Sequence, residues 1–104
     1  MSNPLVSILM PVYNVERFVE SALKSLINQT YENIEIIVVD DCSTDNTFII
    51  CKKISEIDPR VKLFRNSKNL KIVKTLNFAL QQASGNYIAR MDGDDLSTNM
   101  RIEN

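Results

Sequence analysis

Residues 34–41 read Ile34-Glu35-Ile36-Ile37-Val38-Val39-Asp40-Asp41, an apolar and mostly β-branched run, interrupted once, that ends in two aspartates. A run of this kind is typical of a strand inside a parallel sheet, where both faces are covered. Two carboxylates just past a buried strand have little use in a core, because a buried charge needs a compensating partner. The stretch therefore predicts a parallel α/β sheet with a polar site where this strand ends.

The segments on both sides of this strand alternate between strand and helix patterns. Further strands are expected at 5–10, 61–64 and 87–91, and helices are expected at 15–27, 46–57 and 72–83. Strands that alternate with helices through short loops form βαβ units, whose right-handed crossovers place helices on both faces of a parallel sheet. We expect a Rossmann-like α/β fold with the strand order 3-2-1-4, counted along the chain.

Single residues mark the ends of several of these elements. Pro11 is expected to end the first strand, and Asn14 to cap the first helix. Either Ser43 or Asp45 can cap the second helix. Gly85 is suited to a left-handed position at the end of the third helix. These boundaries leave a short polar segment after every strand.

The composition limits the classes of function. The 104 residues suffice for one domain or part of one, and 44% of them are hydrophobic and 24% charged, as in a globular protein. A net charge of −1 provides no basic surface for nucleic acid or acidic lipid. No apolar run approaches the length of a membrane span, and we expect no signal peptide.

Histidine is absent from the sequence, and cysteine occurs twice. Without histidine the chain cannot form a Ser-His-Asp or Cys-His pair or a histidine zinc site, so metal chemistry must use carboxylates, which favour Mg²⁺ or Mn²⁺. The spacing of Cys42 and Cys51 matches neither a zinc site nor a redox CxxC motif. Cys51 falls on the apolar face of the second helix with Ile54 and Ile57. We expect reduced thiols and a cytoplasmic location.

A second acidic cluster, Asp92-Gly93-Asp94-Asp95, follows the strand expected at 87–91. The carboxyl ends of parallel strands lie at one edge of the sheet, so this cluster and Asp40-Asp41 are expected to be neighbours. Three carboxylates in four residues repel one another unless a cation or donors compensate them, and a diphosphate would need a metal to bridge to them. A solvated turn at the second cluster and a helix-capping loop at the first remain alternatives.

Three segments of the chain resemble parts of a known family. They are residues 6–14, which read VSILMPVYN, residues 35–47, which read EIIVVDDCSTDNT, and residues 83–95, which read ASGNYIARMDGDD. In order and spacing they resemble the opening strand, the nucleotide-binding segment and the approach to the DxD motif in family 2 of the glycosyltransferases, the inverting enzymes of the GT-A fold. The resemblance implies a nucleotide-diphosphate sugar as donor and a hydroxyl group as acceptor.

The resemblance also assigns roles to single residues. Around the base and ribose of the nucleotide it places Pro11, Tyr13, Asp40, Asp41 and Asp92. It makes Asp94 the ligand of a divalent cation, Mn²⁺ or Mg²⁺, that bridges the diphosphate. Lys71 stands where members of the family often have glycine, so the loop at 69–71 is expected to have a different shape.

Members of the family continue well beyond residue 104, into the half that binds the acceptor and supplies the general base. The resemblance therefore implies that residues 1–104 are the donor-binding part of a GT-A domain, without a catalytic base and inactive in transfer by themselves. The outer edge of the fourth strand, with apolar Ile88 and Met91, is expected to be bare and to let the chain self-associate. The identity of the acceptor and membrane association of a longer protein are left open.

Two other classes of protein remain alternatives. A binding module that holds a nucleotide without catalysis fits the same residues. A receiver-like phosphoacceptor domain also has an acidic pair after a strand, but that pair follows the first strand, whereas here it follows the second. A Rossmann dehydrogenase is excluded because its first turn needs several glycines and the chain has only two.

Overall fold

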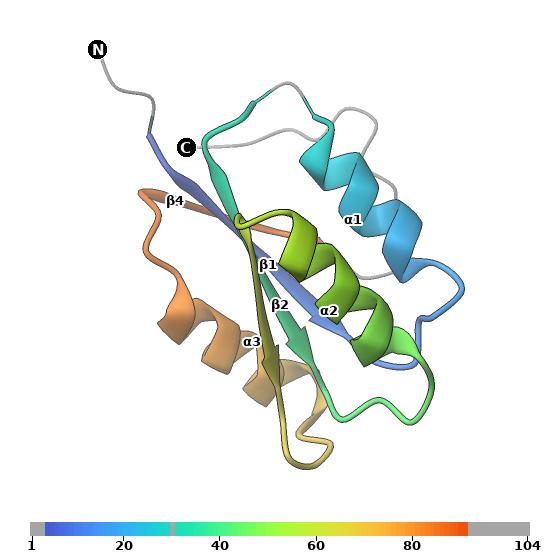
Figure 1. Cartoon of the computed structure of the whole chain (residues 1–104). Coiled ribbons are helices and arrows are strands. Elements are labelled where there is room, and N and C mark those ends of the chain that lie inside the picture. The colour runs from blue at the N-terminus through green and yellow to red at the C-terminus, as the bar shows by residue number, and fades with distance from the viewer. Residues whose placement is uncertain (1–3, 30, 92–104) are drawn as a thin grey trace.

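The computed structural model describes residues 4–29 and 31–91 of the chain. The elements in chain order are β1 (Val6–Val12), α1 (Val19–Ile27), β2 (Ile34–Asp40), α2 (Thr47–Ile57), β3 (Val61–Arg65), α3 (Lys71–Gln82) and β4 (Tyr87–Arg90). All strand pairs are parallel, and the strand order is β3-β2-β1-β4 (Figure 1). The predicted α/β class and the predicted strand order are confirmed.

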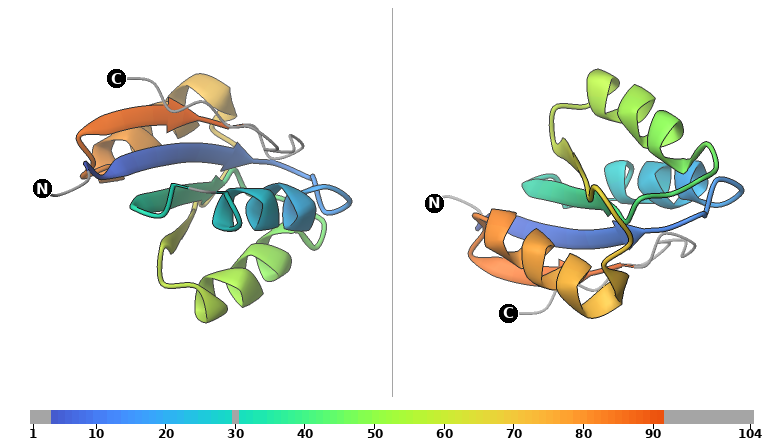
Figure 2. Two further views of the ribbon diagram at one scale, coloured as in Figure 1. Left: turned by 90° about the horizontal axis from the view of Figure 1, so that it is seen from above. Right: turned by 90° about the horizontal axis from the view of Figure 1, so that it is seen from below.

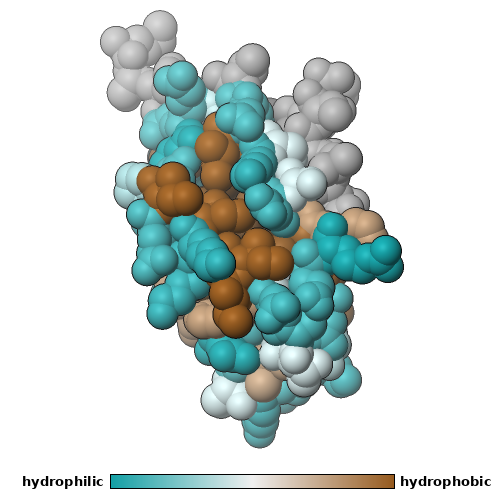
Figure 3. Space-filling view, turned by 45° about the vertical axis from the view of Figure 1, so that its right-hand side comes forward, coloured by the Kyte–Doolittle hydropathy of each residue, from teal (hydrophilic) through white to brown (hydrophobic). Residues whose placement is uncertain are grey.

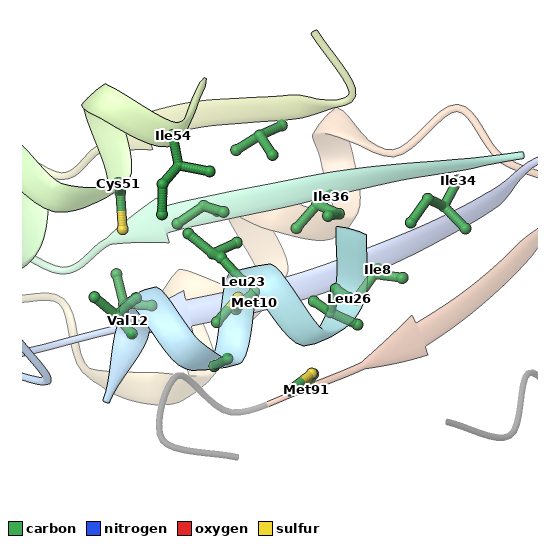
Figure 4. Close-up of a cluster of buried hydrophobic side chains, with 14 of the residues drawn as sticks. Ile8, Met10, Val12, Leu23, Leu26, Ile34, Ile36, Cys51, Ile54 and Met91 are labelled. Carbon is green, nitrogen blue, oxygen red and sulfur yellow. The ribbon is translucent and has the colours of Figure 1, made fainter. Parts of the chain in front are cut away.

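Helices cover both faces of the sheet, as predicted. Figure 2 shows α1 and α2 on one face and α3 on the other. On the first face, Ile8, Met10 and Val12 of β1 belong to the main core, together with residues of α1 and α2 (Figure 4). On the second face, Leu9 packs with Ala79 of α3. Because β1 and β2 are buried on both faces, they are apolar at successive positions instead of alternating.

β1 is longer than predicted, because it continues through Pro11 to Val12. A proline in a central strand lacks an N–H donor for the ladder. The Pro11 nitrogen faces the β4 side, as does the Leu9 carbonyl two residues earlier, which accepts the Met91 N–H at 3.0 Å. β4 ends at Arg90, opposite Leu9, so the missing donor faces the side on which no described strand pairs with β1 at this position.

The predicted cap of the first helix is wrong, and of the two candidates for the second helix only Asp45 bonds to the start of that helix. Helix α1 begins well after Asn14, whose Oδ1 instead accepts the Thr44 N–H at 2.8 Å. Ser43 does not cap α2, because its hydroxyl donates to Asp40 Oδ1 and accepts the Asn14 N–H. Of the two candidates, Asp45 is at the start of the helix, where its Oδ1 accepts the Thr47 N–H at 2.9 Å. Local spacing could not reveal that Asn14 and Ser43 bond to distant loops.

Gly85, between α3 and β4, does not adopt the predicted left-handed conformation. The position requires glycine for space, because a Cβ there would lie 2.5 Å from Ser7 Oγ, 2.7 Å from Ser7 N and 2.8 Å from Leu5 O. The Gly85 N–H donates to Ser7 Oγ at 2.8 Å. This close approach seats the start of β4 against β1.

Replacing Gly85 with alanine is expected to lower the free energy of unfolding by about 2 kcal/mol, because the added methyl group meets backbone atoms that cannot move aside. Chemical denaturation measures the loss. As a control, Gln81→Ala on the exposed side of α3 is expected to change stability by less than about 0.5 kcal/mol. A Gly85→Ala chain as stable as the wild type would contradict the close approach.

The apolar stripe of α2 is shorter than its spacing predicts. Cys51 and Ile54 are buried, but Ile57, the last residue of the helix, is 82% exposed. Ile49 is exposed as well, and Figure 3 shows a band of apolar side chains flanked by polar ones on the face that carries α1 and α2. None of the helices in the described part of the chain combines the length and the hydropathy needed to cross a membrane.

A buried carboxylate joins the amino ends of the strands. Glu35 of β2 accepts hydrogen bonds from Ser7 Oγ at 2.5 Å, Ser84 N at 2.7 Å and Lys62 Nζ at 2.6 Å. Burial alone would raise the pKa of Glu35, but the hydrogen bonds from Lys62, Ser7 and Ser84 lower the pKa to about 2. The network links β1, β2, β3 and the segment before β4 at the edge opposite the loops that follow the strands.

Candidate functional site

The loops that follow β1 and β2 are hydrogen-bonded to each other at the carboxyl edge of the sheet, where the arrowheads of β1, β2 and β3 lie together in the lower part of Figure 1. The Asn14 N–H donates to Ser43 Oγ at 2.9 Å, and the Thr44 N–H donates to Asn14 Oδ1 at 2.8 Å. The Val15 N–H donates to Thr47 Oγ1 at 2.9 Å. The two loops, which were predicted to share one edge, therefore form one bonded unit.

Three non-glycine residues of the described chain have a positive φ, and all three lie at this edge. They are Asn14 with φ 50°, Cys42 with φ 64° and Lys71 with φ 70°, one after each of β1, β2 and β3. Asparagine tolerates this left-handed region, whereas a residue such as cysteine or lysine there costs roughly 1–2 kcal/mol. Strained backbone collects where function needs a loop to keep one shape, so these residues mark the edge as the candidate site.

Asp40, the last residue of β2, is fully buried and bonded to protein on both oxygens. Oδ1 accepts the Ser43 hydroxyl, and Oδ2 accepts the Ser43 N–H at 3.1 Å and lies 3.3 Å from Arg65 Nε. Arg65 also donates to the Ser43 carbonyl at 3.2 Å, and its guanidinium lies over the Phe48 ring, 4.6 Å from the centroid. Asp40 therefore shapes the β2–α2 loop from behind the site.

Asp41 is also buried, with 6% of its surface exposed, and it holds the β3–α3 loop. Oδ1 accepts the Leu70 N–H at 2.7 Å and Asn66 Nδ2 at 2.9 Å, and Oδ2 accepts the Lys71 N–H at 3.0 Å. Burial would raise the pKa of Asp41, but these hydrogen bonds outweigh it and hold the pKa below its ordinary value. Asp41 is thus ionised at neutral pH, and the side chain of Thr75 is a further hydrogen-bond partner of its carboxylate.

Two further residues of the predicted site come from the end of β1. Pro11 is buried and lies beside Val39 of β2 in the strand register. Tyr13, directly after β1, is 46% exposed, so its ring is accessible to a ligand. Pro11, Tyr13 and Asp41 therefore lie at the carboxyl ends of two neighbouring strands, where the sequence placed them.

Asp92, Asp94 and Asp95 lie outside the described residues, so their ribose and metal contacts stay predictions. Within residues 4–29 and 31–91, no three side chains of the types His, Cys, Asp and Glu form a group that could hold a metal ion. Asp40 and Asp41 bond to protein donors and are not arranged around a cation. The described part of the edge therefore offers a ligand polar groups and the exposed ring of Tyr13.

Sequence reasoning missed three polar residues that support this site, namely Arg65, Asn66 and Thr75. Asn66 and Thr75 are buried, and Asn66 Nδ2 donates to Thr75 Oγ1 at 3.0 Å as well as to Asp41. The signal for Thr75 was a hydroxyl at an inward position of an otherwise apolar helix face. Arg65 carries no such signal, because its contacts with the β2–α2 loop depend on strand order.

The chain matches one protein family over nearly its whole length. The family described as Glycosyl transferase family 2 matches residues 7–104. An uncharacterized glycosyltransferase of Haemophilus influenzae is 46% identical over 100 residues, which cover 96% of this chain and 31% of that protein.

Two solved structures share the fold. One is the mannosyltransferase PcManGT from Pyrobaculum calidifontis in complex with GDP-Man and Mn²⁺, with a TM-score of 0.84 and 29% identity, covering 91% of this chain and 29% of that one. The other is S. aureus TarS 1-349 in complex with UDP-GlcNAc, with a TM-score of 0.81 and 35% identity, covering 88% of this chain and 27% of that one.

The parallel strand order, the helices on both faces and the bonded loops at the carboxyl edge define a fold of the GT-A glycosyltransferase class. The chain belongs to family 2 of the glycosyltransferases. It spans 31%, 37% and 41% of the length of three curated relatives that it matches. The family that its sequence resembles is therefore confirmed, and the activity of a whole protein is a proposal.

Proposed function

We propose that this chain is the donor-binding part of an enzyme that transfers a sugar from a nucleoside-diphosphate sugar to an acceptor hydroxyl. The observation that carries the proposal is the ionised Asp41 carboxylate at the carboxyl edge, held by protein donors at the same edge as the exposed Tyr13. Open α/β sheets bind their ligands at this edge. The GDP-Man and UDP-GlcNAc in the two structural neighbours support a nucleotide sugar as the ligand.

In the proposed complex, residues after β1 and β2 hold the base. The Asp41 carboxylate accepts a hydrogen bond from a ring N–H of the base, and the exposed Tyr13 packs its ring against the base. Pro11 and Asp40 are buried and keep the two loops in position behind these contacts. This division of roles differs from the resemblance in moving Pro11 and Asp40 from the ligand surface to its support.

We propose that the acidic segment after β4 binds the remainder of the donor. Asp92 is proposed to contact the ribose, and Asp94 to ligate Mn²⁺ or Mg²⁺. A bound divalent cation neutralises the diphosphate, which the carboxylates would otherwise repel. The Mn²⁺ in the PcManGT complex supports a divalent cation in this family.

The acceptor half and the general base are proposed to belong to a longer protein, so that residues 1–104 alone bind the donor without rapid transfer. A positioned general base contributes roughly 10²–10⁴-fold to the rate. We also propose a cytoplasmic location for this part, because Cys42 and Cys51 are free thiols and reduced cysteines are typical of that compartment.

Calorimetric titration of the chain with UDP and GDP, with and without Mn²⁺, tests the proposal. We expect Mn²⁺-dependent binding of one of the two nucleotides, with weak affinity because few groups are preorganised around the diphosphate. Asp94→Ala is expected to abolish the Mn²⁺ dependence. Glu56→Ala, which removes an exposed carboxylate of α2, serves as the control and is expected to bind like the wild type.

Two outcomes would contradict parts of the proposal. Equal binding with and without Mn²⁺, unchanged in Asp94→Ala, would remove the metal role. Absence of binding to both nucleotides at millimolar concentration would remove the donor-binding function and return the receiver-like alternative to consideration.

We further propose that two copies of the chain associate weakly along β4. Among the described strands β4 pairs only with β1, and its Ile88 is 44% exposed. Met91, expected to be exposed beside it, is instead buried in the main core. An open strand edge pairs readily with another chain. Sedimentation at increasing concentration is expected to show a dimer that Ile88→Lys weakens, and a monomer throughout the range would exclude it.

A further inference from the structure

A cavity of about 540 Å³ lies at the amino edge of the sheet, opposite the edge that carries the candidate site. The C-terminal end of α1, the segment before β2 and the residue before β3 line it, and these parts of the chain lie in the upper part of Figure 1. The lining residues are Ile27, Asn28, Gln29, Glu32 and Arg60. The volume is within the range of roughly 300–1,000 Å³ that is typical of small-molecule sites.

Arg60 forms a fixed wall of this cavity. Its guanidinium donates to the Ile27 carbonyl at 3.2 Å and to the Glu32 carbonyl at 3.1 Å, and it forms an ion pair with Asp58 at 2.9 Å. The hydrogen bonds between the two side chains raise the pKa of Arg60 and lower the pKa of Asp58. Arg60 therefore stays charged and joins α1 to the starts of β2 and β3, so this wall is preorganised for a ligand.

Gln29 contributes an unused hydrogen-bond donor. Its Nε2 is buried and has no hydrogen-bond partner in the part of the chain that the structure describes. A buried donor without an acceptor is destabilising, and such donors are rare in folded proteins. Because Gln29 also lines the cavity, rotation of its side chain brings the amide to an acceptor on a ligand. The unused donor therefore indicates that the cavity is a ligand site.

The charges around the cavity disfavour ionic ligands. The carboxylates of Glu32 and Asp58 oppose the single guanidinium of Arg60, and the C-terminal end of α1 adds a partial negative charge, so phosphate and other anions are repelled. Glu32 already stabilises the charge of Arg60, so an ammonium group would compete with the guanidinium. Within residues 4–29 and 31–91 no three acidic, thiol or imidazole side chains are grouped to hold a metal ion. A neutral ligand is the class that fits.

We propose that this cavity binds a neutral saccharide. A sugar hydroxyl both donates and accepts, and the cavity offers amide N–H groups of Asn28 and Gln29 as donors and the Glu32 carboxylate as an acceptor. Asn28 and Glu32 are exposed, and within the described chain neither side chain forms a hydrogen bond. Ile27 provides an apolar contact for the C–H groups of a sugar ring. The inference does not depend on the binding of a nucleotide at the opposite edge.

Nuclear magnetic resonance of the ¹⁵N-labelled chain tests the inference, because the side-chain N–H signals of Asn28, Gln29 and Arg60 report on the cavity directly. The probes form two matched pairs. Maltose is neutral and maltobionate carries a carboxylate, while N,N′-diacetylchitobiose is neutral and chitobiose carries ammonium groups. We expect both neutral disaccharides to shift the three signals, and both charged ones to shift them only at much higher concentration.

Gln29→Met separates ligand binding from a structural role, because affinity and stability are expected to respond in opposite directions. Methionine keeps the length of the side chain but has no donor, so the free energy of unfolding is expected to rise as the unpartnered group disappears. The affinity for the neutral disaccharides is expected to fall about fivefold, as for the loss of one neutral hydrogen bond. Gln81→Met, the same change at an exposed position of α3, is the matched control and should behave like the wild type.

Glu32→Ala is a second test at an exposed position. It is expected to lower the affinity for the neutral disaccharides about tenfold, as for the loss of a hydrogen bond to a charged acceptor, and Glu56→Ala is its control.

Three outcomes overturn the inference. The first is that neither neutral disaccharide shifts the signals of Asn28, Gln29 and Arg60. The second is that the charged probes bind as well as the neutral ones. The third is that Gln29→Met is less stable than the wild type and keeps its affinity, which would make Gln29 purely structural. Nucleotide binding is expected to be unchanged in the Gln29 and Glu32 variants, so each of these outcomes leaves the proposed function intact.

Discussion

Glu35→Gln is expected to lower the free energy of unfolding by about 3 kcal/mol at neutral pH. The pKa of Glu35 falls from 4.5 to about 2 in the folded chain, and one pKa unit between the two states corresponds to about 1.4 kcal/mol. Glutamine keeps the shape of the side chain but replaces an accepting oxygen with a donor. Either Lys62 or the pair of Ser7 and Ser84 then loses its acceptor.

The pH dependence of stability provides an independent measure of the same network. The folded-state pKa of Glu35 is below the unfolded value, so its stabilisation is fully present above about pH 4.5 and is lost as the pH falls through about 2. Denaturation curves of the wild type and Glu35→Gln are therefore expected to converge in acid. Glu56→Gln, an exposed change in α2, is the control and should match the wild type throughout. A difference in the free energy of unfolding between the wild type and Glu35→Gln that stays constant with pH would refute this account of Glu35.

Asp41→Ala is expected to lower nucleotide affinity about 100-fold and the free energy of unfolding by about 3 kcal/mol. The change leaves the buried Asn66 amide and the Leu70 and Lys71 N–H groups without their acceptor. It also removes the carboxylate proposed to accept the N–H of the base. We expect the nucleotide affinity to fall by more than the loss of one hydrogen bond would cause, because the β3–α3 loop also loses the hydrogen bonds to Asp41 that hold it in place.

Thr75→Val separates the two effects of the Asp41 substitution. It removes the hydroxyl that accepts from Asn66 and is also a partner of Asp41, but it leaves the carboxylate in place, so we expect about 1 kcal/mol of destabilisation and nearly unchanged nucleotide affinity. Calorimetry and chemical denaturation of both variants provide the comparison. If Asp41→Ala retained wild-type affinity, the central contact of the proposed function would be wrong.

The sheet and the place of the site could be predicted because both depend on patterns within short segments. The run at 36–39 is apolar at successive positions, as is typical of a strand covered on both faces, and β2 has that environment. The carboxyl ends of parallel strands share an edge whatever the loops do. Tyr13 and Asp41 therefore had to lie near each other once the strands were recognised.

The contacts that shape the site could not be predicted, because they join residues far apart in the sequence. Asn14 looks like a helix cap from its neighbours, yet its side chain bonds to Thr44. Gly85 looks like a helix terminator, yet the position requires glycine because Ser7 lies too close to leave room for a Cβ. The loop at Lys71 was expected to change shape without glycine, but the lysine takes a left-handed φ. In each case a long-range hydrogen bond or a steric limit outweighs the local preference.

The attachment of β4 has a consequence for the order of folding. β4 pairs only with β1 among the described strands, and the bond from Leu5 N to Asn86 Oδ1 joins residues that are 81 positions apart. Contacts between distant residues form slowly, because a long loop must close before they contribute. β1, β2 and β3 are therefore expected to assemble before β4 docks. A substitution at the docking seat, such as Gly85→Ala, should then accelerate unfolding and leave the folding rate nearly unchanged.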